Sequence, residues 1–540
     1  MGDETHEFDI VVVGAGSAGC VVAGRLSEVS GLKVALVDAG TKDNLSLTKI
    51  PAAVLKTLGH PRYDYRFKTE PDPTRNGRVD QIARGKVLGG SSAINGLIFA
   101  RGAPVDFDRW SAMGNRGWDW QSVLPLFRRL ETSDLSDNSL RGGLGPQAVT
   151  LPTYRHPLTD PFIAAAGQRG IPFNPDYNGE TQEGIGYVQG TIRRGVRVSA
   201  YDGYIAPNLG RSNLQVFPGC RAERLTFQGN RADGLIARRG DKLLRFKARR
   251  GVIVSLGTFN SPQLLMLSGI GPADRLQQLS IDVRRDLSRV GQNMLDHTGF
   301  RMIMEVDTPT ANNQSRGLRA PYHLAQWLLG GRGPVGAASA EAVGFFRSEA
   351  DVATPDLQVT FFPYASEFAP ATGKAVLKPK SLISVGVNMN YPKSRSHVTI
   401  RSANPAEPVE IHYRLFENEN DLETLARGLK IMRSLVEEEP FGKHVVDRSL
   451  FPSGESGEQA DRDFVRANSR SYMHPISTCR MGTDADAVVT PDLKVRGFDG
   501  LRIADASIFP DHISGNINAT TLMIGEKAAD LVKADLRQFA

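Results

Sequence analysis

The sequence predicts an α/β fold in which short buried strands alternate with helices. Three segments far apart in the chain carry this pattern. Ile10–Val13 is a β-branched run that precedes a glycine-rich turn and a helix through Leu26. Val252–Leu256 is likewise followed by a turn and a helix, and Leu501–Ala504 precedes a closing helix over Thr521–Leu536. Short apolar runs of this kind are typical of parallel strands buried on both faces.

Length and composition limit the kinds of protein that fit. The chain has 540 residues, and a single hydrophobic core stops growing at about 250–300 residues, so we expect more than one folding unit. Lys and Arg (65) exceed Asp and Glu (59) by only 6, and no long basic run occurs, so nucleic acid is not an expected partner. The 55 glycines follow no fixed period, which excludes a collagen-like chain.

The cysteines and the first residues indicate the compartment. Cys20, Cys220 and Cys479 are odd in number and far apart, which excludes a disulfide scaffold and favours a reducing compartment. We expect Cys479 to be a buried structural thiol. The ten histidines lack metal-ligand spacing, so no metal site is predicted. The acidic first residues do not form a signal peptide, and no stretch is apolar enough to span a membrane; we expect a cytoplasmic protein.

The first glycine-rich turn has the spacing of a dinucleotide-binding motif. Gly14 permits the tight turn, Gly16 lets backbone N–H groups approach a pyrophosphate, and Gly19 lets the helix pack on the strand. A second strand, Lys33–Val37, ends in Asp38, where a carboxylate accepts hydrogen bonds from ribose hydroxyls. Together these features predict a dinucleotide site, but they do not choose between FAD and a nicotinamide.

Further blocks combine small and apolar residues. The stretch Gly85–Ile98 suits close contact with a flat ring system, and Gly251–Pro272 contains the second strand, turn and helix. Near the end of the chain follow His474–Gly482, Gly500–Ser507 and Ser514–Thr521. A lone histidine before a run of small residues is usually structural, so His474 alone would not indicate catalysis.

Taken together, the blocks resemble the glucose–methanol–choline family of FAD-dependent oxidoreductases nearly from end to end. The two signatures of that family look like Gly85–Ile98 and Gly257–Pro272. Other stretches that resemble the family are Tyr63–Pro71, Gly117–Pro125, Asn178–Gly184 and Gly291–His297. The resemblance implies a Rossmann-like FAD-binding domain and a substrate-binding domain.

The resemblance also implies a set of cofactor residues. The nucleotide site falls on Gly14, Gly16, Ser17, Ala18, Gly19 and Asp38, and the flavin-side loop on Val87, Gly90, Asn95, Gly96, Leu97 and Ile98. The remaining positions are Ala222 at the adenine, Asp505 and Ala506 at the ribityl chain and pyrophosphate, and Asn518. Some members attach FAD through a histidine whose position here holds Ile94, which has no nucleophile, so we expect non-covalent FAD.

The catalytic pair of the family matches His474 and Asn516. Neutral His474 would accept the alcohol proton while hydride leaves for flavin N5, and Asn516 would donate to the developing alkoxide. The alternative is that Asn516 only caps the last helix and that Asn518 faces the substrate.

The resemblance divides the chain into two discontinuous domains. The FAD-binding domain takes residues 6–156, 195–298 and 471–540, and the substrate-binding domain takes 157–194 and 299–470. Within the latter, alternation and periodicity predict strands over Leu382–Tyr391, His397–Arg401 and Val409–Tyr413 and a helix over Asn420–Glu437. By resemblance these form an antiparallel sheet capped by helices.

The expected substrate pocket is apolar and aromatic. We expect Tyr472 and Met473 to line it, with Phe361, Phe362 and Tyr364; the alternative for the last three is that they are strand core. Such a lining suits an aryl or heteroaryl primary alcohol better than a sugar, and no acidic cage for choline is evident. O2 or a quinone-type compound would reoxidise the flavin. Oxidation of a sugar or polyol, a hydroxynitrile lyase and a non-catalytic flavoprotein are the alternatives; the presence of both His474 and Asn516 disfavours the last.

Overall fold

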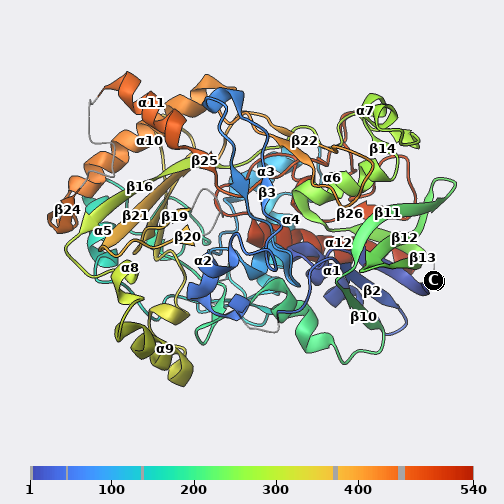
Figure 1. Ribbon diagram of the computed structural model, residues 1–540, viewed down its shortest axis with the longest axis horizontal. Helices are drawn as coiled ribbons and strands as arrows, with labels where there is room; N and C mark the ends of the chain where they lie inside the picture. The colour runs from blue at the N-terminus through green and yellow to red at the C-terminus, as the bar shows by residue number, and fades with distance from the viewer. Residues whose placement is uncertain (1–3, 44–46, 136–138, 369–374, 448–456, 539–540) are drawn as a thin grey trace.

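Two large sheets with helices packed around them make up the protein in the computed structural model (Figure 1). The structure describes residues 4–43, 47–135, 139–368, 375–447 and 457–538. One sheet is built on parallel strands and the other is antiparallel. The predicted α/β fold with a second, antiparallel sheet is therefore confirmed.

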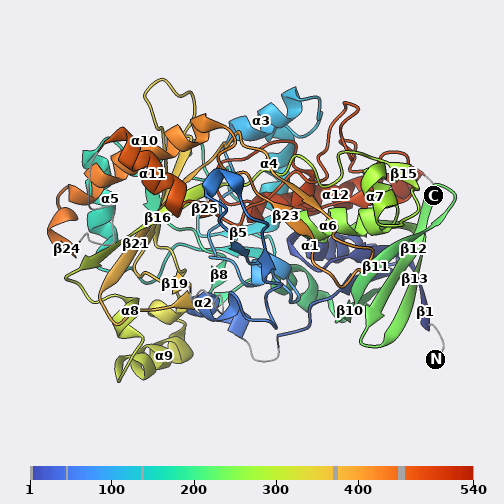
Figure 2. The same ribbon diagram turned by 45° about the horizontal axis from the view of Figure 1, so that its top comes forward.

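The first sheet has seven strands and unites distant segments of the chain. Its order is β10 (Leu214–Pro218), β2 (Val34–Asp38), β1 (Glu4–Val13), β13 (Lys242–Val254), β12 (Arg231–Arg239) and β11 (Arg221–Gln228), with β26 (Leu501–Ile503) also on β13. Strands β10, β2, β1, β13 and β26 run parallel, and β12 and β11 are antiparallel additions. Figure 2 shows β11, β12 and β13 at the end of the molecule opposite α10 and α11. The three strands predicted around the glycine motifs thus lie side by side.

Two helices from opposite ends of the chain pack against each other beside this sheet. Helix α1 (Ser17–Leu26) follows β1, and α12 (Asn518–Gln538) closes the chain. They approach so closely that a Cβ added at Gly525 would lie 2.7 Å from Cβ of Val21. This contact holds the C-terminal segment against the dinucleotide motif.

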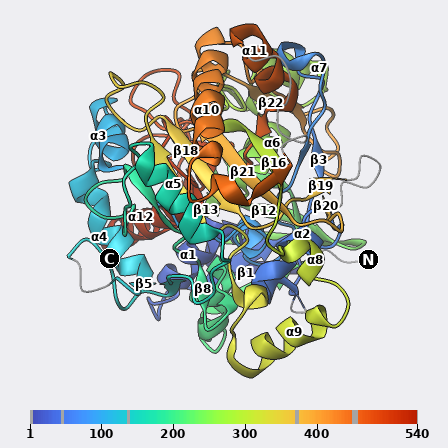
Figure 3. The same cartoon turned by 90° about the vertical axis from the view of Figure 1, so that its left-hand side faces the viewer.

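The second sheet is antiparallel and also has seven strands. Its order is β24 (Val445–Asp447), β16 (Thr298–Val306), β21 (Leu382–Met389), β18 (Leu357–Phe362), β17 (Ala342–Phe346) and β7 (Gly184–Tyr187), with β25 (Arg470–Ser471) also on β16. Helices α10 (Glu419–Glu437) and α5 (Thr159–Gln168) lie over one face (Figure 3) and bury an apolar core with it. The other face is directed toward the first sheet and the cavity described below.

One predicted part of the antiparallel sheet lies elsewhere. Strands β22 (His397–Thr399) and β23 (Glu410–His412) form a separate two-stranded sheet, so the expectation that they belong to the large antiparallel sheet is corrected. Their apolar residues, among them Val398 and Ile411, are buried in the same core as the first sheet. The hairpin falls within the range predicted for the substrate-binding domain, 299–470. Its apolar face nevertheless packs into the core of the first sheet. The boundaries of the two domains otherwise stay a prediction.

The remaining sequence-based expectations concern thiols, metals and membranes. The three cysteines are free and buried, and Cys479 is fully enclosed. Among the described residues, no group of three or more His, Cys, Asp or Glu side chains is placed to hold a metal ion. Within the same ranges, no helix is both long and apolar enough to cross a membrane.

Candidate active site

A large cavity lies where the carboxyl ends of the parallel strands meet the inner face of the antiparallel sheet. Residues that follow β1, β2, β13 and β26 line one half of it, and residues of β16 and β18 line the other. Ligands of open α/β sheets bind outside the carboxyl ends of the strands. The topology therefore places a dinucleotide site and a second binding site in one cavity.

The glycine motif forms the turn between β1 and α1. Gly14 has φ of +108°, and a Cβ on Gly19 would lie 1.8 Å from the carbonyl oxygen of Gly14, so helix and strand touch at this point. Gly16 precedes α1 and provides no side-chain cap, which leaves the first N–H groups of the helix free for a ligand. A helix N-terminus with free N–H groups binds phosphate through these donors and its dipole.

Asp38 lies at the end of β2 and borders the same half of the cavity. Its carboxylate accepts hydrogen bonds from the backbone N–H groups of Ala15 (2.7 Å) and Gly40 (2.5 Å). Burial raises the pKa of Asp38 to about 6, against these two hydrogen bonds. The two backbone bonds fix the orientation of the carboxylate in the position expected for a ribose partner.

The second glycine-rich stretch covers the glycine motif. Gly90 lies directly against Gly16, because a Cβ on Gly90 would be 2.7 Å from Cα of Gly16. Asn95 is held by Arg197, whose Nη1 donates to Oδ1 at 2.8 Å, and Leu97 has φ of +72°. The cavity-lining residues of this stretch are Gly85, Gly90, Ser91, Ile94, Asn95, Gly96, Leu97 and Ile98.

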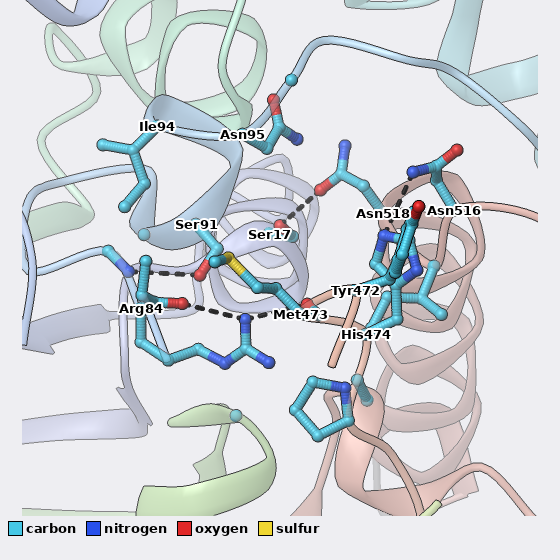
Figure 4. Close-up of a pocket in the computed structure, with 18 of the residues that line it drawn as sticks. Ser17, Arg84, Ser91, Ile94, Asn95, Tyr472, Met473, His474, Asn516 and Asn518 are labelled. Carbon is cyan, nitrogen blue, oxygen red and sulfur yellow. Dashed lines mark hydrogen bonds between the residues drawn. The ribbon is translucent and has the colours of Figure 1, made fainter. Parts of the chain in front are cut away.

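Most of the other predicted cofactor residues line the cavity, and a few do not. Gly14, Gly16, Ser17, Ala18, Asp38, Asp505, Ala506 and Asn518 line the cavity. Three predicted residues do not border it: Gly19 is used in helix packing, Val87 pairs with Thr41, and Ala222 lies on β11. Asn518 accepts a hydrogen bond from Ser17 Oγ at 2.7 Å (Figure 4), which places it in the dinucleotide half.

The dinucleotide half fits FAD on its own chemistry. Ser255 Oγ is buried at the cavity and has no hydrogen-bond partner among the described residues, as expected of a group that awaits a ligand. Asp505 accepts hydrogen bonds from the Gly257 N–H (2.9 Å) and Ser261 Oγ (2.6 Å), which aligns the loops after β13 and β26. Free N–H groups, an orphan hydroxyl and oriented carboxylates are the donors and acceptors that a dinucleotide needs.

His474 and Asn516 meet in the other half of the cavity. Asn516 Nδ2 lies 3.1 Å from His474 Nε2 (Figure 4), and Gln358 Nε2 donates to Asn516 Oδ1 at 3.3 Å. Because Oδ1 is the acceptor from Gln358, Nδ2 is the donor toward His474. Asn516 lies two residues before the start of α12, and its Oδ1 accepts from Gln358, which disfavours the alternative that it serves as a helix cap.

A chain of hydrogen bonds sets the tautomer of His474. The Nε2 atom of His297 lies 2.9 Å from the carbonyl oxygen of Ile513, which can only accept, so this nitrogen carries a proton. The Nδ1 atoms of His297 and His474 lie 3.0 Å apart. Neutral His297 therefore accepts at Nδ1, His474 donates from Nδ1, and the Nε2 atom of His474 keeps its lone pair.

Burial keeps both imidazoles neutral. It lowers the pKa of His297 to about 4 and the pKa of His474 well below 6.5. The neighbouring His297 and the Arg84 guanidinium lower the pKa of His474 further. His474 is thus an unprotonated base at neutral pH.

The backbone around His474 is also held in place. Asp296 Oδ1 accepts a hydrogen bond from the His474 N–H at 2.9 Å, and Oδ2 accepts from Ser471 and Tyr413, both at 2.5 Å. Met473 has φ of +65°, and Arg84 Nη1 donates to its carbonyl oxygen at 2.9 Å. Strained backbone of this kind is found at functional sites where the surroundings enforce it.

Several of these supporting residues had no role in the sequence analysis. They are Arg84, Asp296, His297 and Gln358. Asp296 and His297 end the stretch Gly291–His297, which was noted only as a resemblance to the family. The adjacent titratable residues Asp296 and His297 were the signal in the sequence that this stretch has a function.

The predicted substrate residues are only partly brought together. Tyr472, Met473, Phe362 and Tyr364 line the cavity beside His474. Phe361 does not, and its expected role in the pocket is corrected: it is fully buried in the core of the second sheet and stacks on Phe162 at 4.8 Å. Successive residues of a strand point to opposite faces, so Phe361 and Phe362 cannot both face the cavity.

Comparison with known proteins finds family models and relatives that cover most of the chain. Two GMC oxidoreductase family models match residues 8–299 and 392–525. An oxygen-dependent choline dehydrogenase of Sinorhizobium medicae is 39% identical over 538 residues, covering 97% of this chain and 95% of the relative. Pyridoxine 4-oxidase from "Mesorbium loti" has a similar structure, with a TM-score of 0.87, 29% identity and coverage of 97% and 98%. A formate oxidase variant from Aspergillus oryzae RIB40 has a TM-score of 0.92 and 26% identity over both whole chains.

Proposed function

The chain belongs to the GMC oxidoreductase family and acts on CH–OH groups with FAD, and on this premise we propose that it oxidises a primary alcohol to the aldehyde. In this proposal His474 is the base and Asn516 stabilises the developing alkoxide. The hydrogen-bond chain from Ile513 to His474 is the observation that carries the assignment.

The proposed role of His474 follows from its tautomer. Its Nδ1 proton is engaged by His297, so the lone pair on Nε2 is directed at Asn516 and the cavity. An alcohol hydroxyl within reach of Nε2 transfers its proton to this nitrogen as the C–H bond breaks. The imidazolium formed keeps its Nδ1 hydrogen bond to His297.

Asn516 acts on the same oxygen in this proposal. Its amide has two N–H groups, and its Oδ1 is held by Gln358, so the amide plane is fixed before the substrate binds. Donation to the alcohol oxygen strengthens as negative charge develops on it, which stabilises the transition state more than the ground state.

Bound FAD supplies the two-electron acceptor for the hydride of the carbinol carbon. We propose that FAD is held without a covalent bond, since Ile94 is apolar, lines the cavity and offers no nucleophile. Acid precipitation of the protein tests this, because non-covalent FAD leaves with the supernatant and covalent FAD stays yellow in the precipitate. O2 or a quinone-type compound is the proposed final acceptor, in keeping with the oxygen-dependent name of the relative.

The aromatic lining favours a flat substrate. Tyr472, Phe362 and Tyr364 enclose the part of the cavity beside His474 and offer aromatic faces to an aryl or heteroaryl ring. Pyridoxine, which the name of one structural relative contains, is a heteroaryl primary alcohol.

An anaerobic panel of alcohols tests the proposed function. Benzyl alcohol, pyridoxine, glucose and choline are mixed with the protein, flavin absorbance is followed, and air or a quinone is then admitted. The proposal predicts bleaching by an aromatic alcohol, with aldehyde formed in equal amount. Absence of bleaching by every alcohol, together with cyanide release from mandelonitrile, would instead establish a lyase.

A further inference from the structure

Two arginines lie on the cavity face of the antiparallel sheet. On β16, Phe300 and Met302 are buried in the core beneath the sheet, so Arg301 between them lies on the opposite face. Arg470 on β25 pairs with Gly299, two residues before Arg301, and therefore lies on the same face as Arg301. Both arginines line the cavity that contains His474 and Asn516.

Gly386 lies next to Arg301 on the sheet and makes room for Tyr472. Arg301 pairs with Gly386, which in turn pairs with Thr360, so these residues form one row across three strands. A Cβ on Gly386 would lie 2.7 Å from the hydroxyl oxygen of Tyr472. The missing side chain at Gly386 lets Tyr472 lie over the sheet beside Arg301.

The guanidinium of Arg301 contacts aromatic rings rather than a carboxylate. It lies over the ring of Phe362, 4.3 Å from the centroid. Burial raises the pKa of Tyr472 and of Tyr364, and the charge of the nearby Arg301 opposes both shifts. Arg301 forms no ion pair with any residue that the structure describes.

A second guanidinium, that of Arg470, lies close enough to Arg301 for their charges to interact. Burial lowers the pKa of Arg470 to about 10, and the charges of Arg301 and Arg78 lower it further, while Asp80 opposes them.

The described acidic residues that line the cavity lie away from the two arginines. Among the described residues that line the cavity, the acidic ones are Asp38 and Asp505, and both lie in the dinucleotide half. Arg301 is half-buried, and a cation partly removed from water without a carboxylate partner is destabilised unless a ligand supplies the opposite charge.

We propose that the substrate is an alcohol with an oxyanion group, a carboxylate or a phosphate monoester, and that Arg301 pairs with this group while the hydroxyl reaches His474. This inference rests on the proposed function of the same site. A guanidinium matches the two oxygens of a carboxylate or phosphate in a bidentate pair. A quaternary ammonium such as choline would meet the positive charge of Arg301, with no carboxylate among the described lining residues of this half of the cavity, and is therefore a poor substrate.

A matched series of alcohols tests the inference on the FAD-loaded protein. The series contains ω-hydroxycarboxylates of increasing chain length and 4-(hydroxymethyl)benzoate, each paired with its neutral amide, with 4-(hydroxymethyl)phenyl phosphate and choline as further arms. The quantity measured is the second-order rate constant of anaerobic flavin reduction. For the best-fitting pair, the carboxylate should exceed its amide by about tenfold to a hundredfold, the value of one charge-assisted hydrogen bond.

Variants separate a substrate contact from a structural role. Arg301→Gln should bring the ratio of the carboxylate rate constant to the amide rate constant close to one, whereas Arg301→Lys should keep part of that ratio. Arg284→Gln is the matched control, because Arg284 also stacks on a ring, that of Phe227 at 4.5 Å, but does not line the cavity. FAD content of each variant is measured first.

The outcomes distinguish the two proposals. Equal rates for anion and amide in the parent protein, an equal loss for both in Arg301→Gln, or choline as the fastest substrate would overturn the role of Arg301 while alcohol oxidation stands. Failure of every alcohol, charged or neutral, to reduce the flavin would overturn the proposed function itself.

Discussion

The Nδ1 atoms of His297 and His474 face each other at 3.0 Å and share a single proton. The carbonyl oxygen of Ile513 decides its location, because it requires a proton on Nε2 of His297 and so leaves Nδ1 of that ring as an acceptor. The base of the proposed reaction is therefore oriented by a backbone carbonyl that lies beyond a second imidazole. His297 acts through His474 and is a positioning residue.

Replacement of His297 tests this relationship. In His297→Ala, Nδ1 of His474 loses its acceptor and either nitrogen of the ring can carry the proton. We expect the rate of flavin reduction to fall about tenfold to a hundredfold, the cost of one lost buried hydrogen bond, with FAD still bound. Stopped-flow reduction by a substrate alcohol measures the loss.

His512→Phe is the control for His297→Ala. His512 stacks on His297 with ring centroids 5.2 Å apart but takes no part in the chain from Ile513 to Asn516. A phenyl ring preserves the stacking, so the rate should change less than in His297→Ala. Equal losses in both variants would contradict the role of His297 in setting the tautomer.

The pH dependence of flavin reduction follows from the lowered pKa of His474. Only the neutral ring can accept a proton, so the rate falls as pH drops through the pKa of His474 in the folded protein. Burial, His297 and Arg84 lower that pKa well below 6.5. We therefore expect a level rate between pH 6.5 and neutral, with the acid loss centred below 6.5.

Arg84→Met should move this acid loss toward higher pH, because it removes a positive charge that disfavours the imidazolium. Rate constants measured across the pH range for both proteins give the two midpoints. A midpoint at or above 6.5 in the parent protein would show that the base is another group or a solvent-exposed histidine.

Asn516 should matter less than His474, because it offers one hydrogen bond to the developing charge. Asn516→Ala should reduce the rate of flavin reduction by about 10²–10³-fold, as for loss of one oxyanion donor. Asn516→Asp should be slower still, because a carboxylate repels the alkoxide in a water-poor cavity. Reductive half-reactions of the Ala, Asp and His variants compare these effects, and an Asp variant as fast as the parent would remove Asn516 from the reaction.

Phe361 and Phe362 should give opposite results although they are adjacent. Phe361→Ala empties a core position beneath the sheet, and we expect a loss of about 3–5 kcal/mol in the free energy of unfolding. Phe362→Ala opens the cavity and removes the ring beneath Arg301, so the substrate KM should rise. Denaturant unfolding and steady-state kinetics on both variants measure the two effects; a larger KM effect for Phe361→Ala would contradict the strand orientation.

Local motifs were the part of the site that could be predicted from the sequence. The positions of Gly14 and Gly16, and of Asp38 at the end of the second strand, depend on neighbouring residues, and the structure brings all three to one cavity. His474 and Asn516 came only from the resemblance to a family, since a single histidine or asparagine carries no signal of its own. Their contact across 42 residues is a tertiary feature.

The features of the fold and site that were not predicted depend on strand register and on contacts between distant residues. Phe361 and Phe362 differ only in the face of the strand, which the pairing with β17 and β21 decides. His297 contacts a residue 177 positions away, and its role follows from a carbonyl oxygen on a third segment. The hairpin of β22 and β23 has the alternation of a strand pair, but alternation does not say which core buries it.

Anaerobic flavin reduction in His474→Ala shows whether His474 takes the proton of the alcohol whose hydride reduces FAD. Parent and variant, each with a measured FAD content, are mixed with the best alcohol of the panel, and the bleaching rate is recorded at saturating substrate. If His474 is the base, the variant should bleach about 10²–10⁴-fold more slowly with FAD still bound. A variant that bleaches at the parent rate would contradict it.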